Sequence, residues 1–191
     1  MQFFASEMYK MITSDMTDEE LIHAILGGEK HLYAEIVRRY QQIVANLAYK
    51  IAGDSIDIEE AVQQVFVELY GALPRFRNES KLGTYIYRIT SNVANKMLHS
   101  SFRYQFRKDD AMFDTPAEDR NIEQQIVRQD QIRQVQQAIG RLKPEQRTAL
   151  VLHTYDELSY QQIAEVMQVS LAKVESLIFR AKKNLLKMIK R

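Results

Sequence analysis

Apolar residues recur at helical spacing along most of the chain, and short polar or glycine-containing stretches separate these periodic segments. Thr17 with Glu20 three residues later forms a capping-box pattern ahead of the first clear segment, which two adjacent glycines end. A longer apolar stripe then runs from Ile36 to Ile51 and stops near Gly53. The pattern therefore predicts a short helix followed by a long one.

Asp57 is the predicted N-cap of a third helix with two contrasting sides. One side is apolar, and the other carries Glu59, Glu60, Gln63, Gln64 and Glu68. Residues 54–68 contain five acids and no base. This helix should therefore pack on the core with one side and present a negative surface with the other.

A fourth helix, with Ser80 as its predicted N-cap, has the opposite charge. Its core stripe is Leu82, Ile86, Ile89, Val93 and Met97. Residues 76–108 contain seven bases and one acid, and tyrosines are interleaved with the bases on the remaining sides. Such a surface suits a nucleic-acid backbone together with base stacking. A solvated charged side with tyrosines packed at its edge explains the helix equally well, and the helix alone does not decide.

The composition changes between residues 109 and 130, where seven acids face two bases and Pro116 interrupts any helix. A fifth helix over roughly 122–141 follows, and Pro144 is the predicted first residue of a sixth. We expect an all-α protein made of two small helical domains joined by an acidic linker. The expected bounds are 1–16 for an N-terminal tail, 17–103 and 127–191 for the domains, and 104–126 for the linker.

The last third of the chain has the pattern of a helix-turn-helix. Ser159 with Gln162 forms a second capping box, and Ser170 is the N-cap candidate of the final helix. The apolar stripe of that helix is Val174, Ile178, Ala181, Leu185 and Met188. Residues 173–191 hold seven bases against one acid, so the charge and the paired caps favour DNA binding over an ordinary amphipathic helix with a solvated basic side.

The composition of the chain argues against several classes of function. The net charge of the 191 residues is only +1, so the charge is segregated rather than uniformly basic. The chain has no cysteine, which is compatible with the cytoplasm, and its four histidines lack metal-ligand spacing. We expect no metal, no cofactor and no membrane insertion. A glycine-rich phosphate loop and a nucleophile–base pair are both missing, so the sequence offers little support for an enzyme.

Four segments, in order and at matching spacing, resemble the extracytoplasmic-function (ECF) group of bacterial RNA polymerase sigma factors. They are Leu32–Tyr40, the acidic helix Asp57–Phe66, the basic segment Phe76–Asn92, and the pair Leu142–Arg147 and Leu158–Lys183. Each segment alone is a weak match, whereas four in order are specific. The resemblance spans about 17–103 and 127–188.

The resemblance implies a promoter-specificity subunit that binds core RNA polymerase and promoter DNA, with an anti-sigma factor as a further candidate partner. It places core binding on Asp57, Glu59, Glu60, Gln63 and Gln64. It places melting of the −10 element and capture of a flipped base on Phe76, Ser80, Lys81, Tyr85, Tyr87, Arg88, Asn92 and Lys96, with the Asn92 amide reading the base edge. It places −35 recognition on Ser170, Lys173, Glu175, Ser176, Phe179, Arg180 and Lys183. The acidic linker would thread into the polymerase channels.

Several positions depart from the family pattern. Tyr85 replaces a tryptophan, Gln64 a glutamate and Ala172 a glycine, while Glu175 and Leu177 stand at two frequently basic positions of the final helix. The −35 preference therefore cannot be transferred from relatives. We also expect the free chain to bind promoter duplex poorly, because the acidic segment can lie against a basic face.

Two other function classes remain in competition. A free-standing helix-turn-helix regulator, whose N-terminal bundle senses a ligand or dimerises, would bind DNA without polymerase; an enzyme is the third class. The acidic helix and the basic segment at 57–92 favour the polymerase subunit, since a sensor bundle has no reason to keep both. Binding to core polymerase would discriminate between the first two classes.

Overall fold

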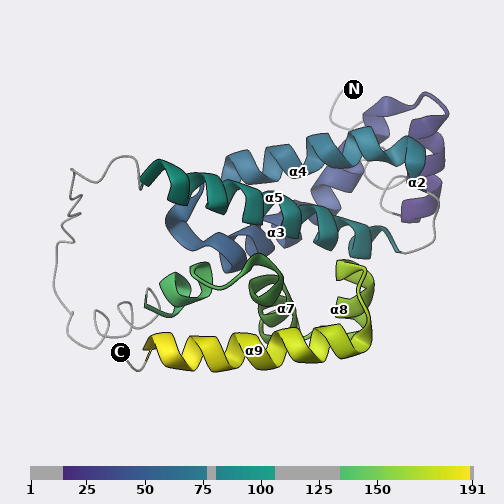
Figure 1. Ribbon diagram of the computed structural model, residues 1–191. Coiled ribbons are helices and arrows are strands. Elements are labelled where there is room, and N and C mark those ends of the chain that lie inside the picture. The colour runs from purple at the N-terminus through teal and green to yellow at the C-terminus, as the bar shows by residue number, and fades with distance from the viewer. Residues whose placement is uncertain (1–14, 77–80, 106–133, 190–191) are drawn as a thin grey trace, which may run out of the picture.

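The computed structural model describes residues 15–76, 81–105 and 134–189 (Figure 1). In chain order its elements are α2 (Asp18–Leu26), η1 (Lys30–Leu32), α3 (Tyr33–Ala52), η2 (Gly53–Ser55), α4 (Ile58–Ala72), η3 (Leu73–Arg75), α5 (Leu82–Gln105), a helical stretch at 134–140, α7 (Pro144–Thr154), α8 (Tyr160–Met167) and α9 (Leu171–Ile189). These ranges contain helices and no strand, so the predicted all-α class is confirmed.

Side-chain caps form the predicted helix starts. The caps are Thr17, Asp57, Ser159 and Ser170. In the first capping box the Thr17 amide donates to the Glu20 carboxylate at 2.6 Å, while the Glu20 amide donates to the Thr17 hydroxyl at 3.3 Å. Ser80 and most of the predicted fifth helix lie outside the described residues.

Helices α2 to α5 form the first unit around one apolar core. Its fully buried members include Leu21, Ile36, Val44, Val65, Leu69 and Ile86. The Arg39 guanidinium ties α2 to α3 by donating to Asp18 at 3.1 Å, to Glu35 at 2.8 Å and to the Met16 carbonyl at 2.7 Å. Hydrogen bonds from Arg38 and Arg39 hold the pKa of buried Glu35 down at about 2, although burial opposes the shift. The carboxylate therefore stays charged and anchors both arginines.

Helices α7, α8 and α9 form the second unit, in which α8 and α9 make the predicted helix-turn-helix. Gln168, at the turn between α8 and α9, adopts a left-handed conformation with φ 54° and ψ 47°. On α9 the residues Val174, Leu177, Ile178 and Ala181 are buried. The predicted α9 stripe is wrong at its end, because Met188 is 37% exposed. Leu177, which stands at a frequently basic position of the family, is only 4% exposed and belongs to the core.

The two units pack against each other and share apolar contacts. Figure 1 shows α7 and α8 lying against α3 and α5. Leu47, Ala48, Ile51 and Ala94 of the first unit belong to one buried cluster with Ile139, Leu152, Ile163 and Val166 of the second. The sequence pattern predicted two helical units, but it did not indicate that they bury apolar surface against each other.

Candidate functional site

The outer face of α4 carries the residues predicted to bind polymerase. Glu59, Glu60, Gln63 and Gln64 are all exposed, and Asp57 caps the helix by accepting the Glu60 amide at 3.0 Å. Ala61, Val65 and Leu69 are buried on the opposite side. Val67 is 67% exposed on the outer face, and the sequence analysis missed it. The spacing could have revealed it, because Val67 follows Glu60 by seven residues, or about two helical turns, and so lies on the same side of the helix, outside the core stripe.

Three residues predicted to bind the −10 element contact one another around the start of α5. The ring of Phe76 lies edge-on to that of Tyr85, with centroids 5.3 Å apart. The Arg88 guanidinium lies 4.5 Å from the Tyr85 ring centroid, in cation–π geometry. Arg88 thereby holds one side of the Tyr85 ring. Lys81, just before α5, and Lys96, on α5, are exposed, whereas Ser80 lies outside the described residues.

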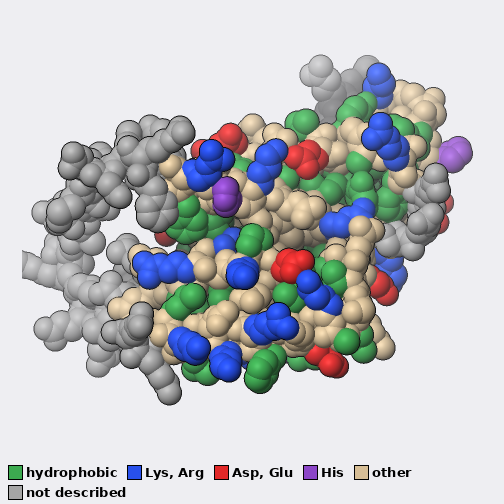
Figure 2. Space-filling model, viewed as in Figure 1, with side chains coloured by type: hydrophobic (Ala, Val, Ile, Leu, Met, Phe, Trp, Pro, Cys, Tyr) green, Lys and Arg blue, Asp and Glu red, His purple; other side chains and the backbone are tan. Residues whose placement is uncertain are grey.

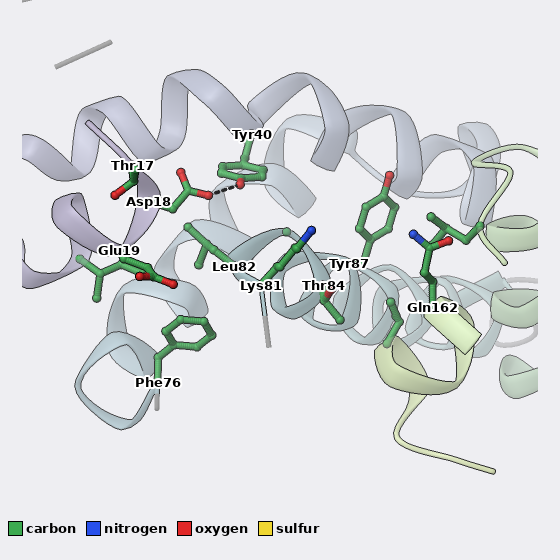
Figure 3. Close-up of a pocket in the computed structure, with 14 residues that line it drawn as sticks. Thr17, Asp18, Glu19, Tyr40, Phe76, Lys81, Leu82, Thr84, Tyr87 and Gln162 are labelled. Carbon is green, nitrogen blue, oxygen red and sulfur yellow. Dashed lines mark hydrogen bonds between the residues drawn. The ribbon is translucent and has the colours of Figure 1, made fainter. Parts of the chain in front are cut away.

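A cavity of about 540 Å³ opens beside this cluster, between the start of α2, the start of α5 and α8 (Figure 3). The first unit contributes Asp18, Tyr40, Phe76, Lys81 and Tyr87 to its lining, with the Tyr40 hydroxyl donating to Asp18 at 2.5 Å. The second unit contributes Leu158, Gln162 and Val166. Residues of both units therefore line the same space.

Asn92 is exposed on α5 and faces the second unit across another cavity, of about 340 Å³. The α5 wall of this cavity also contains Arg88 and Ser91. The opposite wall consists of the first turns of α7 together with the helix-turn-helix turn at 167–169. Asn92 lies off the apolar core stripe of α5, as predicted, and the second unit stands in front of it.

Polar contacts join the two units along α3 and α5. Lys50 of α3 forms an ion pair with Asp156 at 2.9 Å and donates to the Tyr155 carbonyl at 3.3 Å. Tyr87 of α5 is half-buried beside the same aspartate, and burial together with the Asp156 carboxylate raises the pKa of its phenol. Tyr87, predicted to bind DNA, therefore faces the second unit.

Asn95, one turn after Asn92, makes the most specific contact between the units. Its Nδ2 donates to the Thr148 hydroxyl at 2.9 Å and to the Ser91 carbonyl at 2.7 Å. Its Oδ1 accepts from Nη1 of Arg147 at 2.6 Å. This role could not be predicted from the sequence, because a polar residue on the outer side of a helix is ordinary until its partner is known.

Arg147 is buried within the second unit and held mostly by that unit. Its guanidinium donates to the carbonyls of Ile139 at 3.1 Å, Gly140 at 2.5 Å and Leu142 at 2.8 Å. Burial lowers its pKa to about 10, so the group remains charged at neutral pH. Only the Asn95 bond crosses to the first unit. Separation of the units would therefore leave three of these four bonds in place.

The outer side of α9 is open, in contrast to that of α5. Lys and Arg side chains gather along it in Figure 2. The predicted −35 residues Lys173, Glu175, Phe179, Arg180 and Lys183 are exposed, Ser176 is half-buried, and Ser170 caps the helix. Phe179 is 68% exposed.

Two charges on α9 have different surroundings. Lys173 forms an ion pair with Glu145 at the start of α7, at 3.0 Å, and both side chains are exposed. Glu175 makes no ion pair with any other residue of the described ranges, so it does not pair there with Lys182. The only acid of the 173–191 stretch is thus exposed among the bases.

Within the described part of the chain, no cluster of His, Cys, Asp or Glu could hold a metal ion. None of the helices described is long and apolar enough to cross a membrane.

Comparison with known proteins matches both units to family models. Residues 36–103 match the model described as Sigma-70 region 2, and residues 132–185 match Sigma-70, region 4. RNA polymerase sigma-H factor of Pseudomonas aeruginosa is 32% identical over 180 residues, covering 90% of this chain and 93% of the relative. The ECF RNA polymerase sigma-E factor of Escherichia coli K12 is 31% identical over 179 residues, covering 90% and 93%.

Two solved structures share the fold. CnrH, in complex with the cytosolic domain of CnrY, aligns with a TM-score of 0.61 at 22% identity, covering 89% of this chain and 95% of that one. The sigma factor RpoE of Bartonella quintana, in complex with the anti-sigma factor NepR, aligns with a TM-score of 0.56 at 18% identity, covering 83% and 96%.

Proposed function

The chain belongs to the ECF group of the sigma-70 family and is a promoter-recognising subunit of RNA polymerase, and from that premise we propose how its surfaces divide the work. The outer face of α4 docks on core polymerase. The α5 face captures −10 bases after melting, and the outer side of α9 reads the −35 element. The chain acts as an initiation factor without catalysis of its own, in the cytoplasm.

Core docking through α4 is supported by the separation of its two faces. Glu59, Glu60 and the two glutamines are exposed, and the residues that α4 buries lie on its other side, so charge reversal there should leave the helix intact. Val67 adds an apolar contact to the same face. An acidic rim around an exposed aliphatic residue has the composition of a protein-binding surface.

Capture of a −10 base is supported by the arrangement at α5. Asn92 presents an exposed amide that is not needed by the core, and an amide can both donate to and accept from a base edge. Tyr85, braced by Arg88 and Phe76, offers an aromatic ring for stacking. A neighbouring base could therefore stack while the flipped base is read.

Readout of the −35 element is supported by the open side of α9. Glu175 can only accept hydrogen bonds, and cytosine N4 is the donor of that kind in the major groove. The exposed Lys173, Arg180 and Lys183 supply the phosphate contacts that position the helix. We therefore assign Glu175 to base readout.

Asn92 is exposed but lines the cavity between the units, and Tyr87 is half-buried beside Asp156 of the second unit. A DNA strand that approached these residues would meet the second unit, so we infer that the units separate before −10 bases are captured. The contact between the units should open at a small cost in hydrogen bonds. Arg147 would lose one hydrogen bond out of four, and the Ser91 hydroxyl is buried at this contact without a hydrogen-bond partner. Core polymerase would hold the separated state by binding it preferentially.

An anti-sigma factor is a further proposed partner. Both structural neighbours were solved in complex with a second protein, CnrY in one case and the anti-sigma factor NepR in the other. The two units offer such a partner the same α5 and α8 surfaces that face each other in the free chain.

The observation that carries the docking proposal is the exposed acidic face of α4, and charge reversal tests it. Glu59→Lys with Glu60→Lys should abolish binding to core polymerase in a pull-down while circular dichroism stays unchanged. Glu19→Lys with Glu29→Lys makes the same charge change at exposed positions away from α4 and should bind normally. Full core affinity in the α4 variant would refute docking through this face. Binding of the wild-type chain to promoter duplex alone, without core binding, would favour the free-standing regulator.

A further inference from the structure

The C-terminal half of α9 borders a groove that the proposed DNA contacts do not account for. The groove combines apolar residues with cations, namely Phe179, Leu186 and Met188 with Arg141, Lys182, Lys183 and Lys187. Leu186 is 59% exposed and Phe179 is 68% exposed. No carboxylate residue is among the described residues that line the groove.

Duplex DNA explains only part of this groove. Phe179 and Lys183 belong to the proposed −35 surface, whereas Leu186 and Met188 lie one to two turns further along α9. An exposed leucine and methionine gain little beside phosphates, and a contiguous apolar patch ringed by cations is typical of a protein-binding site. The fitting occupant is a peptide that carries both acids and apolar side chains.

We propose that this occupant is the acidic segment of the same chain, residues 109–130. The segment has seven acids against two bases, and the pair Met112 and Phe113 stands among the aspartates at 109, 110 and 114. Its carboxylates complement the four cations of the groove, and its apolar pair complements Leu186 and Met188. The segment lies outside the described residues, so the groove itself and the sequence carry the inference.

The flanks of the segment bring it to the groove. One flank is the end of α5 at Gln105, and the other is the helical stretch at 134–140, which leads directly to Arg141 in the groove lining. Figure 1 shows both flanks at the same end of the molecule as the C-terminal end of α9. Random-coil statistics for a connection of this length give an r.m.s. span of about 30 Å, and hence an effective concentration on the order of millimolar. Intrinsic binding as weak as about 0.1 mM would then keep the groove roughly 90% occupied.

Occupation of the groove would compete with DNA, because Phe179 and Lys183 belong to both surfaces. The inference rests on the proposed role of α9 and deepens it by naming how that surface is regulated. The first unit leaves the outer side of α9 exposed, so it does not itself mask the −35 surface.

Neutralising the segment in the full chain provides the first test. The variant Asp109→Asn, Asp110→Asn, Asp114→Asn should bind a mixed-sequence 24-base-pair duplex about tenfold more tightly than wild type at low salt, by fluorescence anisotropy, with the gain shrinking as salt rises. The matched control Glu29→Gln, Asp54→Asn, Glu68→Gln makes the same charge change at exposed positions away from the groove and should change affinity less than about twofold. Equal affinities for the two variants would overturn masking. Absence of DNA binding by every variant at every salt would instead contradict the proposed role of α9.

Photo-crosslinking provides the second test and identifies the occupant. With p-benzoylphenylalanine at position 186, mass spectrometry should find links to peptides within 109–130 of the same chain. The same probe at exposed Val67 should give none of these links. Links between isotopically distinct chains would make a second copy the occupant, and either that result or the absence of links would overturn the proposal.

Discussion

The α5 face and the outer side of α9 are both basic, yet the folded chain treats them oppositely. The α5 face meets the second unit through Asn95 and Tyr87, whereas the outer side of α9 stands open, with Lys173, Arg180 and Lys183 exposed. The difference matches the DNA that each surface is proposed to bind. A −35 duplex exists before polymerase arrives, while unpaired −10 bases exist only after melting. The surface that contacts the second unit is the one needed later.

The most disruptive way to break this comparison is to remove Arg147, which belongs both to the fold of the second unit and to its contact with the first. Arg147→Met should lower the free energy of unfolding of that unit by about 3 kcal/mol, since three buried carbonyls lose their donor. Urea denaturation followed by circular dichroism measures this loss. Asn95→Ala is the control, because it removes the bonds to Thr148 and Arg147 between the units and one bond within α5, and leaves the three carbonyl bonds of Arg147 in place. An equal, small loss in both variants would contradict the assigned difference.

Acid should destabilise the first unit more than the second, because Glu35 lies in the first. The pKa of Glu35 is held at about 2 in the fold, below its usual 4.5, so its contribution is complete above pH 4.5 and is lost as pH falls towards 2. The shift corresponds to about 3 kcal/mol at most. Wild type should therefore lose more stability between pH 6 and pH 3 than Glu35→Gln does, in the transition of the first unit. Parallel losses in the two proteins would exclude Glu35 as the cause.

Asn92 and Asn95, one turn apart on α5, sharpen the comparison because their variants should act in opposite directions. Asn92→Ala should leave stability nearly unchanged and weaken open-complex formation by about 1–3 kcal/mol, through loss of a base contact. Asn95→Ala should raise binding of the free chain to single-stranded −10 DNA by loosening the units. Permanganate footprinting and anisotropy measure the two effects. An unchanged footprint in Asn92→Ala would remove that residue from the base pocket.

The smallest expected effect concerns Glu175 on the open surface. Selection of −35 duplexes from a random pool should give preferences for wild type and Glu175→Arg that differ at one or two base positions, with guanine replacing cytosine opposite the side chain. Affinity for the preferred sequence should change by about 1–3 kcal/mol. Identical preferences would mean that Glu175 points to solvent.

The helices of each unit could be predicted from the sequence, because their starts depend on local chemistry. The capping pairs at Thr17 and Ser159, the cap at Asp57 and the apolar periodicity are all short-range signals. The end of the α9 stripe was predicted wrongly at Met188, since periodicity does not show where the neighbouring helix stops. The family and its polymerase function followed from four ordered motifs. The roles of individual site residues stay predictions.

The contact between the units could not be predicted, because it pairs residues more than fifty positions apart. Asn95 meets Thr148 and Arg147, and Lys50 meets Asp156, only after both units have folded. In the sequence, each of these polar side chains could equally well be exposed to solvent on the surface of its own unit. The expectation that the acidic segment lies against a basic face stays a prediction, and in the structure the α5 face contacts the second unit.

A distance measurement between the units tests the central claim most directly. The chain has no cysteine, so spin labels can be placed specifically at Gln42→Cys on α3 and Gln161→Cys on α8, both exposed positions. Double electron–electron resonance should give one short distance for the free chain and a clearly longer one when core polymerase is bound, and Asn95→Ala should populate the longer distance without polymerase. The same short distance in the free and polymerase-bound chains would contradict the claim that the units must separate to expose the −10 surface.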